Sequence, residues 1–208
     1  MLKKVFERCK AFKLRMNPLK CTFGVSFGKF LGFLVHSKGI DVDLAKATAI
    51  ATMRPPVTVK ELKSLLGKVS YIWRFISELA SITSAFTKLL KKGQNFEWGE
   101  AQQTAFKRLQ QIMMNLPTVQ ASIHKRLLLL YLATNSYAIS ALIAQDNGGG
   151  IEQPVYYISR ALKDAETRYP RVERACLAIV YASQRLRHYF LAYEVWLMTK
   201  SHAIKALL

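Results

Sequence analysis

The chain has 208 residues, of which 51% are hydrophobic and 21% are charged, and this balance excludes a disordered or low-complexity protein. Its 31 Lys and Arg residues outnumber 13 Asp and Glu residues, which leaves a formal net charge of +18. Such an excess favours a polyanionic partner, either nucleic acid or an anionic membrane surface.

The first 40 residues are strongly basic, with nine Lys and Arg side chains and one acid, Glu7. Apolar residues at helical spacing within residues 1–16 predict an amphipathic surface helix; a basic targeting presequence would show the same pattern. Asn17-Pro18 ends this helix. Two strands, 22–26 and 29–36, are predicted next, joined as a hairpin by the glycines between and around them.

Residues 45–115 are predicted to be all helical. Asp43 is a suitable N-cap for a short helix that must end before Pro55-Pro56. Thr58 and Glu61 form a capping-box sequence that begins the next helix. Its apolar residues recur with a period of 3.6, at Leu62, Leu65, Leu66, Val69, Ile72 and Trp73. Two more helices are predicted, at 82–90 and 100–115.

The pattern changes after Pro117. Strands are predicted at 127–131, 137–145, 154–159 and 194–199, with a long helix at 170–191 and another helix beginning at 202. The whole chain is therefore predicted to have a mixed α+β fold. We divide it into residues 1–44, 45–116 and 117–208.

All three parts contain recognisable motifs: Asn17-Pro18-x-Lys20-Cys21-x-Phe23-Gly24, Val59-Lys60-Glu61-Leu62, Leu89-Leu90-Lys91-Lys92-Gly93, Pro154-Val155-x-Tyr157-x-Ser159-Arg160 and Arg187-His188-Tyr189-Phe190. Together and in this order they resemble the pol polyprotein of gypsy-type LTR retrotransposons, in a plant-like form.

This resemblance implies that residues 1–44 are the end of a reverse transcriptase palm with a primer-grip-like hairpin. Residues 45–116 would be the helical thumb and connection, and 117–208 an RNase H-like α/β domain that is truncated at its C-terminus. The parent activities would be RNA-directed DNA polymerase and ribonuclease acting on RNA–DNA hybrids. Because residues 1–40 would lack their sheet partners, we expect them to expose apolar surface and to be mobile.

Both parent activities need several carboxylates that converge on paired Mg²⁺ ions. The family's polymerase turn contains two adjacent aspartates, and this chain has no Asp-Asp dipeptide. The three carboxylate positions of the RNase H-like domain fall on Ala133, Glu173 and Lys200, so only Glu173 is retained, as a relict catalytic residue. An acid favoured by the helix dipole is the alternative role for Glu173. We therefore expect no metal site and no cofactor in this chain, and incomplete catalysis.

The predicted helix that begins after Thr58 is the best candidate for a binding surface. The resemblance implies that Lys63, Gly67 and Tyr71 face the minor groove of a template–primer duplex, and Lys60 and Lys68 flank them. Their i, i+4 and i+8 spacing places the three on one stripe. A solvated basic helix face explains the same residues equally well.

The hairpin residues Phe30, Leu31 and Gly32 resemble the primer grip, although Phe30 and Leu31 would also suit a core. The expected function is sequence-independent binding of template–primer nucleic acid, with the rest of a pol polyprotein as a further partner. A residual RNase H-type endonuclease and a decayed transposon-derived protein without a selected activity are the alternatives.

No membrane partner is expected, because apolar runs such as 127–133 are far shorter than the roughly 20 residues that span a bilayer. No secretory signal is recognised either. The three cysteines are widely spaced and contain no CxxC pair, which argues against a disulfide framework and against a zinc knuckle. These features predict an intracellular, reducing environment without naming a compartment.

Overall fold

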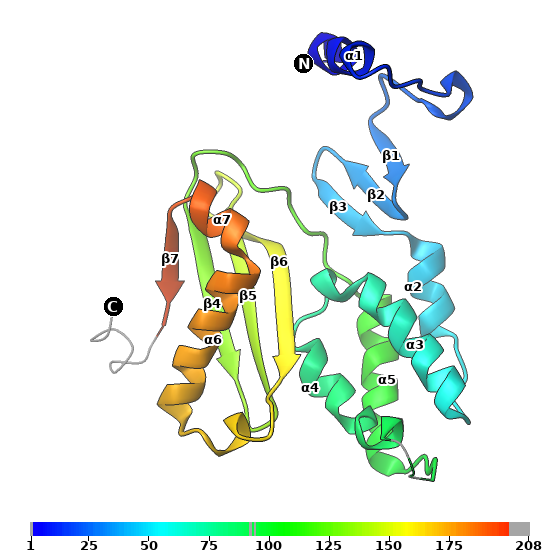
Figure 1. Ribbon diagram of the computed structural model, residues 1–208, viewed down its shortest axis with the longest axis vertical. Helices are drawn as coiled ribbons and strands as arrows, with labels where there is room; N and C mark the ends of the chain where they lie inside the picture. Colours follow the sequence, from blue (N-terminus) through cyan, green and yellow to red (C-terminus); the bar gives the residue numbers. More distant parts are fainter. Residues whose placement is uncertain (1, 92, 94, 200–208) are drawn as a thin grey trace.

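The computed structural model describes residues 2–91, 93 and 95–199, and it confirms the mixed α+β fold (Figure 1). The α-helices are α1 (Leu2–Ala11), α2 (Leu44–Ala51), α3 (Val59–Tyr71), α4 (Leu79–Thr83), α5 (Glu100–Met114), α6 (Arg171–Arg185) and α7 (Arg187–Ala192). The strands are β1 (Phe27–Phe30), β2 (Phe33–His36), β3 (Gly39–Val42), β4 (Leu128–Thr134), β5 (Ala138–Asp146), β6 (Glu152–Ala161) and β7 (Val195–Met198). Short 3₁₀ turns are η1 (Pro18–Lys20), η2 (Trp73–Phe75), η3 (Ser84–Phe86), η4 (Lys88–Leu90) and η5 (Glu166–Arg168).

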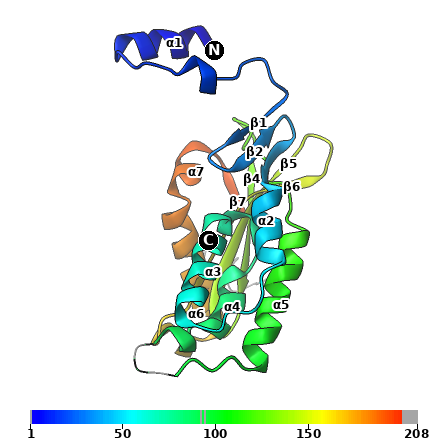
Figure 2. The same cartoon turned by 90° about the vertical axis from the view of Figure 1, so that its right-hand side faces the viewer.

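Helix α1 stands apart from the rest of the molecule, at one end of its long axis (Figures 1 and 2). None of its residues is buried, and its apolar side chains Leu2, Val5 and Phe6 are exposed. One aromatic contact links it to the following segment, between the rings of Phe6 and Phe23 at 5.7 Å. The expected exposure of apolar surface near the N-terminus is therefore confirmed, whereas mobility there stays a prediction.

The predicted strands 22–26 and 29–36 are wrong. Strands β1, β2 and β3 instead form an antiparallel meander, in which Phe30 pairs with Phe33 across a tight turn. The two turn residues, Leu31 and Gly32, both have positive φ, 49° and 77°. Two such residues make the turn that suits a right-twisted hairpin. The turn could not be predicted from the sequence, because a leucine, like other residues with a Cβ, seldom adopts positive φ.

Helices α2 to α5 with η2 to η4 form the helical unit. Thr58 caps α3 by accepting a hydrogen bond from the Glu61 N–H at 3.2 Å, and the Glu61 carboxylate accepts from the Val57 N–H at 2.8 Å. The predicted helix 82–90 is wrong in form, because α4 ends at Thr83 and two 3₁₀ turns follow. The fully buried residues of this core include Leu62, Leu65, Val69, Phe75, Phe86, Phe106 and Leu109.

Strands β4 to β7 with α6 and α7 form the sheet unit. The strand order is β6-β5-β4-β7, antiparallel except that β4 and β7 run parallel. Helix α6 packs on this sheet (Figure 1), and Ala182 on the helix and Leu186 at its C-cap belong to a second core. The predicted helix 170–191 is divided at Leu186, whose φ of −107° and ψ of 23° leave the helical region while its side chain stays buried. The helix predicted from 202 lies outside the described residues.

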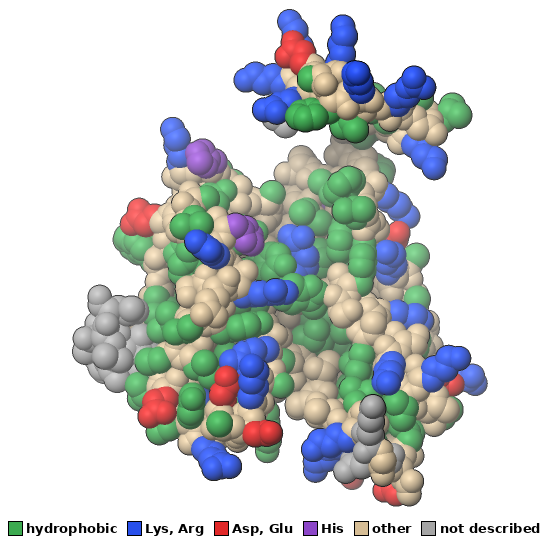
Figure 3. Space-filling model, in the orientation of Figure 1, with side chains coloured by type: hydrophobic (Ala, Val, Ile, Leu, Met, Phe, Trp, Pro, Cys, Tyr) green, Lys and Arg blue, Asp and Glu red, His purple; other side chains and the backbone are tan. Residues whose placement is uncertain are grey.

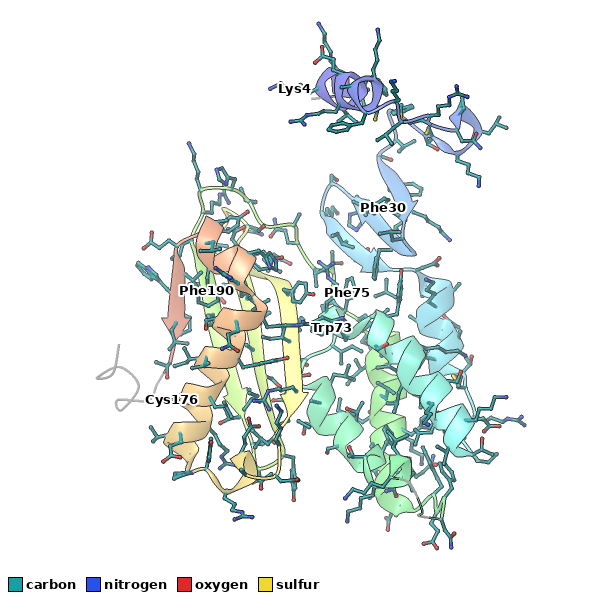
Figure 4. The ribbon with its side chains drawn as sticks, in the orientation of Figure 1. Lys4, Phe30, Trp73, Phe75, Cys176 and Phe190 are labelled. Carbon is teal, nitrogen blue, oxygen red and sulfur yellow. The ribbon has the colours of Figure 1, made fainter. Side chains whose placement is uncertain are left out.

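The helical unit and the sheet unit are joined by polar and aromatic contacts. Figure 4 shows Trp73 of η2 between them, and its ring meets Tyr156 of β6 edge-on at 5.5 Å. The N–H of Ala80 donates to Ser159 Oγ at 3.0 Å. Within the described residues, no helix is long and apolar enough to cross a membrane.

Candidate nucleic-acid interface

Helix α3 divides cleanly into a buried face and an exposed face. Leu62, Leu65 and Val69 lie in the core of the helical unit. The opposite side of the helix carries Lys60, Lys63, Ser64, Gly67, Lys68 and Ser70, all exposed. The period that buries the leucines therefore also places the lysines and the glycine together on the outer surface.

The meander closes over the C-terminal end of this exposed face. The ring of Phe33, on β2, stacks on the ring of Tyr71 with their planes 2° apart and their centroids separated by 4.8 Å. A Cβ added at Gly32 would collide with the Lys46 ammonium and the Tyr71 hydroxyl. The hairpin turn thus lies directly against α3, and glycine is required there both for its positive φ and for this close approach.

A cationic groove of 470 Å³ lies between α2 and α3, and we call it the α3 groove. The space above the backbone of Gly67 is open, because a Cβ at that position would meet no atom within 4 Å. Lys46 places its ammonium 3.9 Å from the centre of the Tyr71 ring. The residues that line the groove are Lys46, Ala49, Ile50, Ser64, Gly67, Lys68, Tyr71 and Ile72.

The groove contains two lysines, Lys46 and Lys68. Neither Lys46 nor Lys68 forms an ion pair with any residue that the structure describes. The nearby carboxylate of Asp43 accepts a hydrogen bond from Lys29 at 3.0 Å and a second one from the Ala45 N–H, and these bonds lower its pKa. The Tyr71 hydroxyl is buried and, among the described residues, has no hydrogen-bond partner. The groove therefore presents positive charge beside the ring of Tyr71, whose hydroxyl is enclosed.

The structure brings only part of the predicted set together. Gly32, Gly67, Lys68 and Tyr71 meet at the α3 groove, whereas Lys60 and Lys63 project from α3 without lining it.

The side chains of Phe30 and Leu31 are 65% and 73% exposed, so the alternative that they belong to a core is wrong. Figure 4 shows Phe30 on the hairpin, away from Trp73 and Phe75. Lys46 was missed by sequence reasoning, because nothing distinguishes this lysine on a short helix from other surface lysines.

Two of the three expected carboxylate positions of the sheet unit, Ala133 and Glu173, lie within the described residues. Ala133 lies on β4 opposite Ser140 of β5 and lines a cavity of 220 Å³, which also contains Glu78 from the helical unit. Glu173 is exposed in the first turn of α6, where its neighbour Arg174 donates to the Asn135 carbonyl at 2.9 Å. Lys200 lies outside the described residues.

A methyl group at Ala133 cannot ligate a cation, so these residues do not fit a pair of magnesium ions. In the described part of the chain, no group of three or more His, Cys, Asp or Glu side chains is placed to hold a metal. These residues therefore do not supply the converging carboxylates that two-metal phosphoryl transfer requires.

Comparison with known proteins shows what this chain is similar to. Residues 98–197, which contain α5 and most of the sheet unit, match the RNase H-like domain found in reverse transcriptase. Over 188 residues, 90% of the chain, it is 27% identical to the Transposon Tf2-3 polyprotein of Schizosaccharomyces pombe (strain 972 / ATCC 24843), and the Tf2-4 polyprotein matches equally well. The resemblance to a retrotransposon pol polyprotein is confirmed. This pol segment spans 14% of the length of those relatives.

Solved structures agree with this fold. The foamy viral protease-reverse transcriptase in complex with RNA/DNA hybrid superimposes with a TM-score of 0.73 and 20% sequence identity, over 96% of this pol segment and 28% of the viral chain. The same viral enzyme in complex with dsDNA gives a TM-score of 0.68 at 19% identity, over 88% of the segment and 39% of the viral chain. The pol segment therefore shares the reverse transcriptase and RNase H-like fold, while its assignment to the gypsy type and the plant branch stays a prediction.

Proposed function

We propose that this pol segment binds double-stranded nucleic acid through the α3 groove and the exposed lysines of α3, without preference for sequence. The observation that carries the proposal is the closure of the hairpin turn onto Tyr71 and Lys46, because it joins the meander and α3 into one cationic surface. The structural neighbours that hold dsDNA and an RNA/DNA hybrid support the same partner class.

The chemistry of the groove suits a phosphate backbone. Lys46 and Lys68 supply unpaired positive charge, and exposed lysines release counter-ions when they neutralise phosphates. Gly67 lets a duplex approach the helix backbone closely, and the half-buried Tyr71 ring beside it can pack against a sugar. Contacts of this kind position a duplex but do not read its bases.

The test compares two groove lysines with a distant one. Replacing Lys46 and Lys68 together by Gln should weaken duplex binding and reduce the slope of log K against log salt by about 2, since each phosphate contact contributes about 0.9. The matched control is Lys107→Gln on α5, also exposed and outside the groove. Fluorescence anisotropy with one duplex of fixed length between 50 and 200 mM salt measures both quantities. An equal loss in the control, or a salt-independent affinity, would contradict the proposal.

We also propose that this pol segment does not cleave RNA–DNA hybrids by itself. The support is chemical: the position expected for the first carboxylate is Ala133, and Glu173 is isolated on α6. A magnesium-dependent cleavage assay on a labelled hybrid should show no turnover above that of a Glu173→Gln variant. Turnover by the natural sequence that disappears in Glu173→Gln would establish the residual endonuclease instead.

A further inference from the structure

A second cavity lies where the helical unit meets the sheet unit. Its volume is 490 Å³, and it is lined from one side by Trp73 and Thr83 and from the other by Ser159, Tyr181 and Arg185. It shares no lining residue with the α3 groove. Figure 3 shows a hollow between the two units on the face that carries α3 and α6. We call this the interdomain cavity.

One wall of the interdomain cavity holds an unpaired cation in a defined place. The Arg185 guanidinium lies over the ring of Trp73, 5.5 Å from its centroid, and Trp73 is itself held by the edge-on ring of Tyr156. Arg185 forms no ion pair within the part of the chain that the structure describes. A guanidinium carries five N–H donors and no acceptor, so a partner on this wall must accept hydrogen bonds.

The hydroxyls around Arg185 are also donors. Ser159 Oγ accepts the Ala80 N–H, which leaves the proton of Ser159 free to be donated into the cavity. The Tyr181 hydroxyl has no hydrogen bond to any described residue. Burial raises the pKa of Tyr181, which keeps the hydroxyl protonated at neutral pH, while the positive charges of Arg185 and Arg160 act on it in the opposite sense.

No acid competes for these donors. The cavity has no Asp or Glu among its lining residues. The nearby Glu166 is held by Arg160 through two bonds, from Nη1 at 2.6 Å and from Nη2 at 2.9 Å, so this carboxylate is already neutralised. A pocket with a fixed guanidinium, free hydroxyl protons and no lining carboxylate is complementary to an anion.

We propose that the interdomain cavity binds a phosphate group, with Arg185 as its cation and with Tyr181 and Ser159 as hydroxyl donors. The planar fork of arginine matches two phosphate oxygens at once. The volume falls within the range of small-molecule sites and leaves room for the remainder of a phosphate ester. This site goes beyond the proposed function, because it uses none of the residues of the α3 groove.

The first experiment is a calorimetric titration of the protein with inorganic phosphate. A titration with chloride at the same ionic strength is the reference. Saturable binding is expected, at least tenfold weaker in Arg185→Gln and several-fold weaker in Tyr181→Phe, which keeps the ring and removes only the donor. Arg187→Gln removes the same charge from an exposed residue outside the cavity and should bind phosphate normally. Binding that does not saturate, or an equal loss in Arg187→Gln, would overturn the proposal.

The second experiment identifies the source of the phosphate. If it belongs to a nucleic-acid backbone, Arg185→Gln weakens duplex binding and lowers the salt slope by about 1, whereas Arg187→Gln does not. If duplex binding is unchanged while inorganic phosphate binding is lost, the ligand is a free phosphate or a mononucleotide. The lysine variants of the α3 groove retain phosphate binding in the interdomain cavity, so failure of this proposal and failure of duplex binding by the groove are distinguishable.

Discussion

Helices α1 and α3 have similar amphipathic patterns and different surroundings. Both are basic, yet α3 buries Leu62, Leu65 and Val69 while α1 buries no residue. Helix α3 packs in a core supplied by α5 and η2, whereas α1 has one ring contact, to Phe23. An amphipathic pattern therefore specifies which face of a helix is apolar, but burial needs a second surface from elsewhere in the chain.

The largest effect on stability is expected from a substitution in α3, the better packed of the two helices. Leu65→Ala removes a fully buried side chain from α3 and should lower the free energy of unfolding by about 2–5 kcal/mol. The matched control is Leu2→Ala in α1, where the leucine is half exposed and the change should stay within about 0.5 kcal/mol. Urea unfolding of both variants measures the difference. A comparable loss for Leu2→Ala would show that α1 is packed in solution.

A smaller effect is expected at the beginning of α3. Thr58→Ala removes the side-chain acceptor for the Glu61 N–H and should cost about 1 kcal/mol of unfolding free energy. Thr58→Ser retains the hydroxyl and should leave stability nearly unchanged. The same urea unfolding measurement applies, and equal destabilisation by both substitutions would mean that the methyl group of Thr58, rather than its oxygen, matters.

The smallest expected effect is on the pH dependence of the free energy of unfolding. Hydrogen bonds from Arg160, together with the Lys163 N–H, lower the pKa of Glu166 from 4.5 to about 2. Because the pKa is depressed in the folded state, the pair contributes stability above pH 4.5 and loses it as the pH falls toward 2, by at most about 1 kcal/mol.

Glu166→Gln should therefore flatten the decline of unfolding free energy between pH 4.5 and pH 2. Asp43→Asn, which alters the exposed pair with Lys29 and keeps a suitable N-cap residue for α2, should flatten it less. Thermal unfolding across this pH range measures both variants. An unchanged pH profile in Glu166→Gln would contradict the role of this ion pair.

The helices with clear local signals were predictable. Asp43, Thr58 and the proline after α5 mark helix ends through local hydrogen bonding and backbone restriction, and these elements lie where the pattern indicates. The prediction of the hairpin strands was wrong because the turn between them uses Leu31 at positive φ, a conformation that no local preference of leucine favours. The division of the long helix at Leu186 was not predicted for a related reason. The break accompanies the packing of this buried side chain, which the local sequence does not reveal.

The candidate sites were likewise predictable only in part. Gly67 and Tyr71 could be placed with Lys63 on one stripe of α3 from their spacing alone, with Lys68 flanking it. Lys46 and Gly32 join them only because α2 and the meander fold against that face. The interdomain cavity was not predictable, because Trp73 and Arg185 are more than a hundred residues apart in the chain and meet only across the two units.

By itself, the sequence determined the amphipathic helices, the excess of positive charge and the absence of a carboxylate at Ala133, because these properties depend on residue type and short-range spacing. The tertiary structure decided which cations share a surface and which apolar faces are covered. Those outcomes depend on contacts between distant segments, and a helical or strand period carries no information about the partner that it will meet.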